Sequence, residues 1–190
     1  MKKKIILVLS TLALLVQFVG AVKVSSIAEY AVLADETEVT FTCRLAVLAQ
    51  KGMKLFVSDG QRGAVIYGKI DQTFEFGDLL ESGLTAKKIT FDYAPEMVQV
   101  KANTLKKANS SVNIKPVRIA MSDVSMDKVY CYTRLMGHYD ATTSMLSAGG
   151  QQVLVYNHFN KEMPKETGKT TVDGILIYYK RKNLMELYVM

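Results

Sequence analysis

Histidine and cysteine, the side chains most often used in metal and nucleophilic chemistry, are scarce in this sequence. The two histidines, His138 and His158, are separated by a long stretch of chain. A zinc site would need two or more further ligands at suitable spacing, and Cys131 and Asp140 form no known pattern with His138. The sequence also contains no glycine-rich loop of the kind that holds phosphates. It therefore predicts neither a metal site nor a bound cofactor.

Cys131 is the one residue that could act as a nucleophile beside His138. A reactive thiol has to be accessible to its substrate. The alternation of polar and apolar residues over 129–135 instead puts Cys131 on the apolar face of a strand, where packing into a core is expected. We therefore predict no catalytic residue and no enzymatic activity.

Aromatic and basic side chains on strand faces are better candidates for function. Proteins bind single strands and sugars by stacking aromatic rings beside basic or polar groups. The polar face of the predicted strand 129–135 carries such a set, and the matching strand of an earlier segment carries an arginine. Phe56 faces opposite to Leu55 and Val57, so we expect its ring to be exposed. The predicted ligand-binding residues are Tyr130, Tyr132, Arg134, Arg44 and Phe56.

A second interpretation explains the two tyrosines without a ligand. Aromatic residues between tandem domains commonly pack against the neighbouring domain or the linker. Under that interpretation, replacing Tyr130 and Tyr132 by alanine would destabilise the fold, whereas at a ligand site it would abolish binding with little loss of stability.

The first residues predict export. Three lysines, Lys2–Lys4, precede an apolar run over 5–19, and small residues follow at Gly20 and Ala21. This order is typical of a secretory signal peptide. The alternative is a membrane anchor, but the run is about 15 residues long and a spanning helix needs about 20. We expect residues 1–21 to be removed, leaving a mature chain with no membrane span in the periplasm or outside the cell.

Charge and cysteine content limit the partners of the mature chain. The sequence has 24 basic and 18 acidic residues, and removal of the three signal lysines leaves 21 against 18, or +3. This is not the strongly basic balance of a protein that binds a phosphate backbone. Cys43 and Cys131 could pair in an oxidising compartment. Because the predicted strands put them in different domains, we expect two buried free thiols.

The chain contains an internal duplication. Residues 58–68 align without a gap with residues 147–157, at an offset of 89. Upstream, residues 39–45 match residues 129–135 at an offset of 90. Matches in the same order along the chain predict two copies of one structural unit.

Each copy is predicted to be rich in strands. Apolar and polar residues alternate over 39–47, so that Val39, Phe41, Cys43, Leu45 and Val47 share one face. The first copy is predicted to hold strands at 39–47, 53–57, 64–67, 79–91 and 97–100, a short helical segment at 27–33, and turns at Ser58–Gly60 and Ala94–Pro95. The second copy is predicted to hold strands at 129–135, 144–146 and 153–156 and a terminal hairpin of 172–179 and 184–189. The predicted domains are 22–102 and 116–190, joined by a polar linker at 103–115.

The strand pattern and its motifs resemble a known family. In the first copy a long first strand runs into a hairpin, Asp59-Gly60 precedes the strand 64–67, and Phe74-Glu75-Phe76-Gly77-Asp78 breaks the chain before strand four. This resembles the OB-fold in its bacterial, nucleic-acid-binding-like form, and the chain resembles the tandem OB-fold proteins exported by Gram-negative gut bacteria. The second copy departs from the motif, with Ala148 at the aspartate position and no Gly-Asp break.

The resemblance implies an all-β fold of two tandem five-stranded barrels after the signal peptide. The competing fold is a single two-sheet sandwich. OB-fold barrels bind ligands on the outer face of strands two and three. We therefore expect a non-catalytic exported binding module for an extended polymer (a glycan or peptide) or for an envelope partner protein. The alternative is a protein that binds single-stranded nucleic acid, which the +3 charge and the export signal disfavour.

Overall fold

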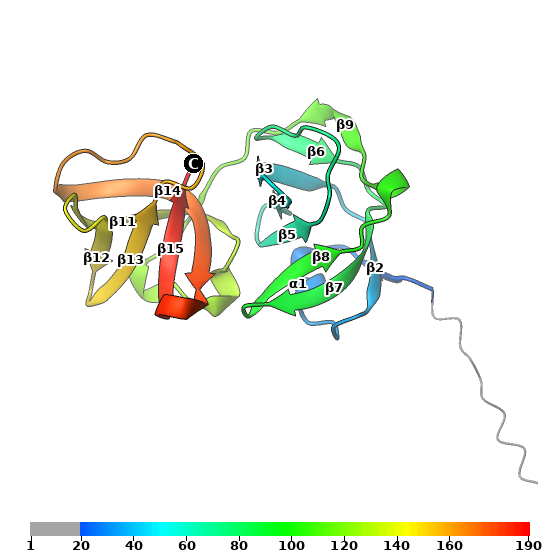
Figure 1. Ribbon diagram of the computed structural model, residues 1–190, viewed down its shortest axis with the longest axis horizontal. Helices are drawn as coiled ribbons and strands as arrows, with labels where there is room; N and C mark the ends of the chain where they lie inside the picture. Colours follow the sequence, from blue (N-terminus) through cyan, green and yellow to red (C-terminus); the bar gives the residue numbers. More distant parts are fainter. Residues whose placement is uncertain (1–19) are drawn as a thin grey trace, which may run out of the picture.

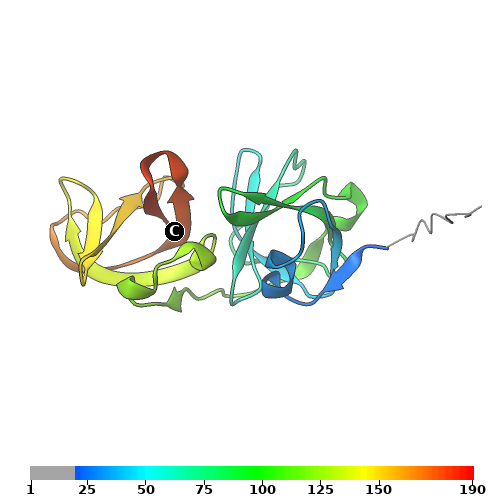
Figure 2. The ribbon, with the colours of Figure 1, turned by 90° about the horizontal axis from the view of Figure 1, so that it is seen from below.

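The computed structural model describes residues 20–190, so residues 1–19, which hold nearly all of the expected signal peptide, lie outside the described part. The described chain forms two lobes built almost entirely of strands, as Figure 1 shows. A second view from below shows the same two lobes side by side (Figure 2). Within residues 20–190, no helix has the length and apolar character needed to cross a membrane. The predicted all-β class is confirmed.

The first lobe is a nine-stranded sheet that curls on itself, in the order β1-β2-β7-β8-β5-β4-β3-β6-β9. The strands near the two ends of this order, β2 and β3, are consecutive parts of one bent stretch of chain, interrupted only at residues 42–44. The two sides of the sheet are therefore brought together. The strand β5 runs parallel to β8. The elements are β1 (Val22–Val24), α1 (Ile27–Ala31), β2 (Glu38–Phe41), β3 (Leu45–Lys51), β4 (Lys54–Ser58), β5 (Gly63–Tyr67), β6 (Asp78–Leu80), β7 (Thr85–Phe91), β8 (Ala94–Val98), the 3-10 turn η1 (Ala102–Thr104) and β9 (Lys107–Ser111).

Local sequence explains much of this lobe. The alternating residues Val39, Phe41, Leu45 and Val47 all lie in its core, and Cys43 packs half-buried against them. The predicted turn after β4 forms around Asp59, whose Oδ1 accepts hydrogen bonds from the backbone N–H of Gln61 at 2.9 Å and of Arg62 at 2.8 Å. The other carboxylate oxygen accepts from the N–H of Ile27 at 2.7 Å. The aspartate of the motif therefore ties the turn to the start of α1.

Three predicted elements of the first copy need correction. The expected strand 79–91 is two strands, β6 and β7, with a turn around Gly83 between them. The expected turn Ala94–Pro95 is the start of β8, and the chain reverses instead at Asp92 and Tyr93, whose φ angles are +45° and +69°. Part of the expected linker 103–115 is the strand β9, which pairs with β6.

The second lobe contains a closed five-stranded barrel. The strand order is β11-β12-β13-β15-β14, and pairing of β14 with β11 closes the ring. The strand β13 runs parallel to β15, as β5 does to β8 in the first lobe. Its elements are β10 (Val117–Arg118), the 3-10 turns η2 (Met121–Asp123) and η3 (Met126–Lys128), β11 (Tyr132–Asp140), β12 (Met145–Ala148), β13 (Gln151–Tyr156), β14 (Gly168–Tyr179), the 3-10 turn η4 (Lys180–Lys182) and β15 (Leu184–Val189).

The two lobes share one strand order when their strands are compared in sequence. In the second lobe, β11 pairs with β12 and β14, and β13 runs parallel to β15. In the first lobe, the bent stretch of β2 and β3 takes the place of β11: it pairs with β4 and β7, and β5 runs parallel to β8. The two lobes are therefore built on one pattern of strand pairing. The expected first strand of the second copy, 129–135, starts three residues later at Tyr132, because Tyr130 has a φ of +68° and breaks the extended backbone.

Candidate functional site

The two lobes meet along an apolar seam. On the first lobe, Leu48, Phe56 and Val65 point away from the barrel interior, because the interior is filled by their chain neighbours. On the second lobe, Tyr130 and Ile175 face them. The seam thus covers part of the outer face of β4 and β5.

Backbone contact at one end of the seam requires a glycine. A Cβ atom built on Gly63 would lie 1.8 Å from the carbonyl oxygen of Tyr130. That distance is far inside van der Waals contact, so no other residue fits without separating the lobes. The neighbouring thiol of Cys131 is buried against the loop of the first lobe, with its Sγ 3.9 Å from the carbonyl oxygen of Gln61. Burial raises the pKa of this thiol. The two lobes are therefore fitted to each other at the level of the main chain.

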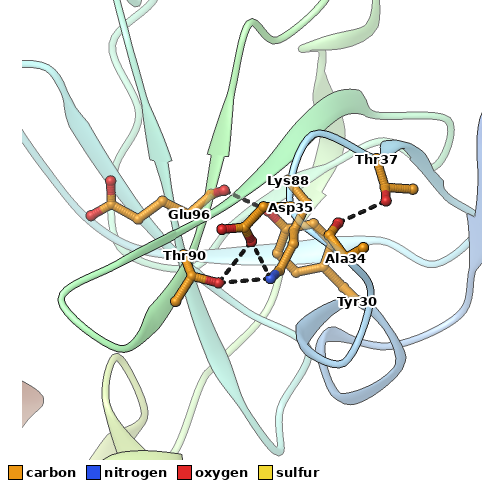
Figure 3. A network of polar contacts seen from close by, with 7 residues as sticks. All are labelled: Tyr30, Ala34, Asp35, Thr37, Lys88, Thr90 and Glu96. Atoms are coloured by element: carbon orange, nitrogen blue, oxygen red, sulfur yellow. Dashed lines mark hydrogen bonds and ion pairs between the residues drawn. The ribbon is translucent and has the colours of Figure 1, made fainter.

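A buried carboxylate links the lobes at the centre of the seam. Glu96, on β8, is 3% exposed, and its Oε1 accepts a hydrogen bond of 2.7 Å from the hydroxyl of Tyr130. The Nζ of Lys54 lies 3.6 Å from the same oxygen. The backbone carbonyl of Glu96 accepts a 2.6 Å bond from the hydroxyl of Tyr30, on α1 (Figure 3). Burial raises the pKa of Tyr30 and of Tyr130, which keeps both hydroxyls protonated as donors.

A second polar cluster lies beside this link within the first lobe. The ammonium group of Lys88, on β7, is buried and lies 2.6 Å from the carboxylate of Asp35 and 2.7 Å from the hydroxyl of Thr90 (Figure 3). These bonds, first of all the one from Lys88, lower the pKa of Asp35. All three groups are occupied with one another, so the cluster braces the loop between α1 and β2 against the sheet.

An aromatic hollow opens beside the seam. We call it the tyrosine cleft; its volume is about 200 Å³ and it receives residues from both lobes. The first lobe supplies the first residues of β4 and the β7–β8 turn. The second lobe supplies the hairpin of β14 and β15, together with Val129, Tyr130 and His158. The lining residues are Lys54, Phe56, Phe91, Asp92, Val129, Tyr130, His158, Ile177, Tyr178, Tyr179 and Tyr188.

Ring contacts fix the walls of the tyrosine cleft. His158 stacks on Tyr188 with ring centroids 4.3 Å apart and planes 22° apart. Tyr178 meets Tyr93 edge to face at 5.7 Å across the two lobes. Phe91 stays 50% exposed at the mouth of the cleft. Rings held in this way keep their orientation before a ligand arrives, which lowers the entropic cost of binding.

The polar groups of the tyrosine cleft are few and already balanced. Lys54 lies near Glu96 and also over the ring of Phe91, with its Nζ 5.7 Å from the ring centroid. The carboxylate of Asp92 lies 3.5 Å from the ammonium group of Lys180. Burial, and then the charges of nearby lysines, lower the pKa of His158, so its imidazole is neutral near pH 7. The cleft can therefore stack on a ring and exchange neutral hydrogen bonds with it.

The structure brings only two of the five predicted ligand-binding residues to this cleft, and both differ from expectation. Phe56, expected to be exposed, is 2% exposed, because the second lobe covers it with Tyr130 and Phe159. Tyr130, expected on a polar strand face, precedes the strand and is buried in the seam. For these two residues the structure agrees with packing between the lobes, and they form the floor of the cleft.

The other three predicted residues lie elsewhere. Tyr132 is half-buried and meets Phe76 edge to face at 5.8 Å, in a different hollow. Arg134 is exposed and binds both carboxylate oxygens of Asp173 at 2.6 Å. Arg44 is exposed and pairs with Glu81 at 3.2 Å. No single surface collects the five.

No local sequence pattern marks the residues that line the tyrosine cleft. Phe91 ends a strand, and Tyr178 and Tyr179 end another, so each looked like an ordinary strand residue. Only the docking of the two lobes puts them in one hollow. The adjacent tyrosines in the terminal hairpin were the one available signal, since such a pair must direct one ring to each face of a strand.

No group of three or more histidine, cysteine, aspartate or glutamate residues within 20–190 is placed to hold a metal ion. The chain matches no family model, no curated protein and no solved structure.

Proposed function

We propose that this chain is a non-catalytic binding module that holds one sugar ring of an oligosaccharide in the tyrosine cleft. The observation that carries the proposal is the position of the cleft. It lies over the outer face of β4, beside the β7–β8 turn, where an OB-fold barrel binds its ligand, and it is walled by preoriented rings from both lobes.

The chemistry of the cleft suits a sugar. The C–H face of a pyranose is apolar and packs on aromatic rings, while its hydroxyl groups need hydrogen-bonding partners. Tyrosine rings offer both in one side chain. Tyr178, Tyr179, His158 and Asp92 all line this hollow. The hydroxyl of Tyr178 already donates a 2.7 Å hydrogen bond to Oδ1 of Asn183, so it would meet a sugar as an acceptor.

The size of the cleft suits one ring of a longer chain. Its volume of about 200 Å³ is below the range of roughly 300–1,000 Å³ that is typical of sites for drug-sized ligands. Beyond Lys54 the surface continues over Met53 and over Tyr67, which pairs with Lys54 across β4 and β5. Both side chains are largely exposed. A polymer could therefore rest further units on this surface.

Single-stranded nucleic acid is the weaker ligand for this cleft. Such a ligand needs cations along the path of its phosphates. Lys54 is balanced by Glu96 and Lys180 is balanced by Asp92, at 3.6 Å and 3.5 Å. The net charge of +3 of the expected mature chain also disfavours a nucleic-acid ligand. A neutral polymer does not need unpaired cations, so these ion pairs do not weaken its binding.

Export fits the same proposal. We infer that residues 1–21 direct the chain out of the cytoplasm, to a compartment where polysaccharides and envelope proteins are plentiful and nucleic acid is scarce. The shared strand order of the two lobes supports their origin by duplication, and with it the likeness to exported tandem OB-fold proteins. An envelope protein that presents its glycan to the cleft would be a natural partner.

A glycan array probed with residues 22–190 tests the proposal. We expect a restricted set of neutral oligosaccharides to bind, with binding that changes little when salt is raised. Silence across the array would contradict glycan binding. Binding of single-stranded DNA that weakens steeply with salt, with no bound glycan, would support the nucleic-acid alternative instead.

A further inference from the structure

A second hollow begins between the two lobes and continues along the second lobe, and it shares no lining residue with the tyrosine cleft. It consists of two parts with volumes of about 460 Å³ and about 730 Å³. Both parts are lined by Met190 and adjoin at this residue; we call the two together the Met190 groove. The smaller part begins at the first lobe, beside Phe76, and the larger part reaches Arg118 on β10.

Two stretches of chain line both parts of the Met190 groove. One wall is β11, where Tyr132 lines the smaller part and Arg134 and Met136 line the larger part. The other wall is the loop after β13, in which residues 159–161 line the smaller part and residues 162–164 the larger. At about 3.3 Å per residue, Tyr132 to Met136 spans roughly 13 Å, the length of about four residues of an extended peptide.

The surface of the Met190 groove has the composition of a protein-binding site. Its apolar part combines the rings of Phe76 and Tyr132 with the side chains of Met136, Met163 and Met190. Aromatic residues, methionine and arginine are the types enriched at the cores of protein interfaces. Methionine adapts its shape to different side chains. Phe76 and Met136 are 46% and 43% exposed, so both are reachable from solvent.

The side-chain charges of the groove are unbalanced in favour of cations. Its two side-chain carboxylates are already paired, Asp173 with Arg134 at 2.6 Å and Glu162 with Lys165 at 2.8 Å. In contrast, Arg118, Lys51 and Lys161 form no ion pair with any residue of the described range 20–190, although the ammonium group of Lys51 donates a hydrogen bond to the backbone carbonyl of His158. Lys51 and Lys161 lie at one part of the groove and Arg118 at the other. A ligand with carboxylates near both ends and apolar groups between would match this pattern.

We propose that the Met190 groove binds an extended peptide segment of a partner protein, in which acidic residues flank apolar ones. The acidic side chains pair with Arg118 and with Lys51 or Lys161, and the apolar side chains pack on the methionines and on Phe76. This site is separate from the tyrosine cleft and does not depend on the binding of a sugar.

Selection from a random 12-residue peptide library displayed on phage, with residues 22–190 as the target, tests the proposal. We expect enriched peptides to carry aspartate or glutamate beside apolar residues. A synthetic copy of the most enriched peptide should bind at least about tenfold more weakly to the double variant Arg118→Glu, Lys161→Glu, and also more weakly to Phe76→Ala. The controls are Lys106→Glu, an exposed lysine outside the groove, and Phe91→Ala, at the tyrosine cleft; both should bind the peptide as the wild type does.

A second measurement keeps the test decisive if a groove variant misfolds. Amide chemical shifts of the wild-type protein, recorded with and without the peptide, should change along β11 and residues 159–164. No enrichment above that seen with an unrelated protein would overturn the proposal. It would also be overturned by peptide affinity that survives the double charge reversal, or by shift changes confined to other surfaces. None of these results would bear on glycan binding, which Phe91→Ala tests separately.

Discussion

The hydroxyl of Tyr130 in the second lobe donates a 2.7 Å hydrogen bond to the carboxylate of Glu96 in the first. Both residues are almost fully buried, and the carbonyl group of Glu96 also accepts from Tyr30 on α1. One residue of β8 thus joins the helix, the sheet and the neighbouring lobe. The same contact positions Tyr130, which lines the tyrosine cleft at the junction of the lobes.

Removing this hydrogen bond should destabilise the protein. Tyr130→Phe keeps the ring but leaves the buried carboxylate of Glu96 with one partner fewer, at an expected cost of about 1–3 kcal/mol. The free energy of unfolding from urea titration measures this cost. Tyr67→Phe, which alters an exposed tyrosine of β5, is the control and should change stability by less than about 0.5 kcal/mol. Equal stability of the two variants would show that the link between the lobes contributes nothing.

The close approach at Gly63 gives a second prediction. Gly63→Ala should force the lobes apart, because the new Cβ would overlap the carbonyl oxygen of Tyr130. The radius of gyration from small-angle X-ray scattering should then rise. Cys131, buried at the same contact, should react faster with a maleimide.

Gly52→Ala is the matched control for that experiment. Gly52 has a φ of +58° but no atom within 4 Å of its Cβ position. The substitution therefore strains the backbone without touching the seam. If both variants kept the scattering profile and the slow Cys131 reaction of the wild type, the lobes would not be held as described.

The stacked histidine makes stability depend on pH. Burial and the charges of Lys51 and Lys54 lower the pKa of His158 below its usual 6.5. As the pH is lowered from about 7.5 to about 5.5, His158 therefore takes up a proton more readily in the unfolded chain than in the folded chain. The free energy of unfolding falls over the same pH range. His158→Gln should lose this part of the dependence, measured as the change in melting temperature between those pH values. His138→Gln, at an exposed histidine, should behave as the wild type; a wild-type slope in His158→Gln would contradict the assignment.

Alternation along the chain predicted the strands well because it reports a local property, the face of the sheet to which a side chain points. Phe56 does face opposite to Leu55 and Val57, as expected. Its exposure was mispredicted because a lobe more than 70 residues away in sequence, through Tyr130, covers that face. Period two identifies the face but contains no information about what packs on it.

Turn and linker chemistry were less informative at two places. Pro95 indicated a turn, but it lies within β8 and pairs with Thr90 of β7. The chain reverses instead at Tyr93, whose φ of +69° is a conformation that tyrosine seldom adopts. The polar run at 107–111 suggested a linker, but only Ala108 is buried there and the strand lies at the sheet edge. An exposed edge strand and a linker have the same composition. For the same reason, residues such as Phe91 could not be assigned to a site before the lobes were seen together.

The most direct test of sugar binding at the tyrosine cleft is the affinity of one array-identified oligosaccharide for Phe91→Ala and Phe76→Ala, compared by titration calorimetry. The two phenylalanines are similarly exposed, at 50% and 46%, but only Phe91 lies at the cleft. Loss of a stacking ring should weaken binding at least about tenfold in Phe91→Ala, while Phe76→Ala binds as the wild type does. Unchanged affinity in Phe91→Ala, or an equal loss in both variants, would contradict binding at the cleft.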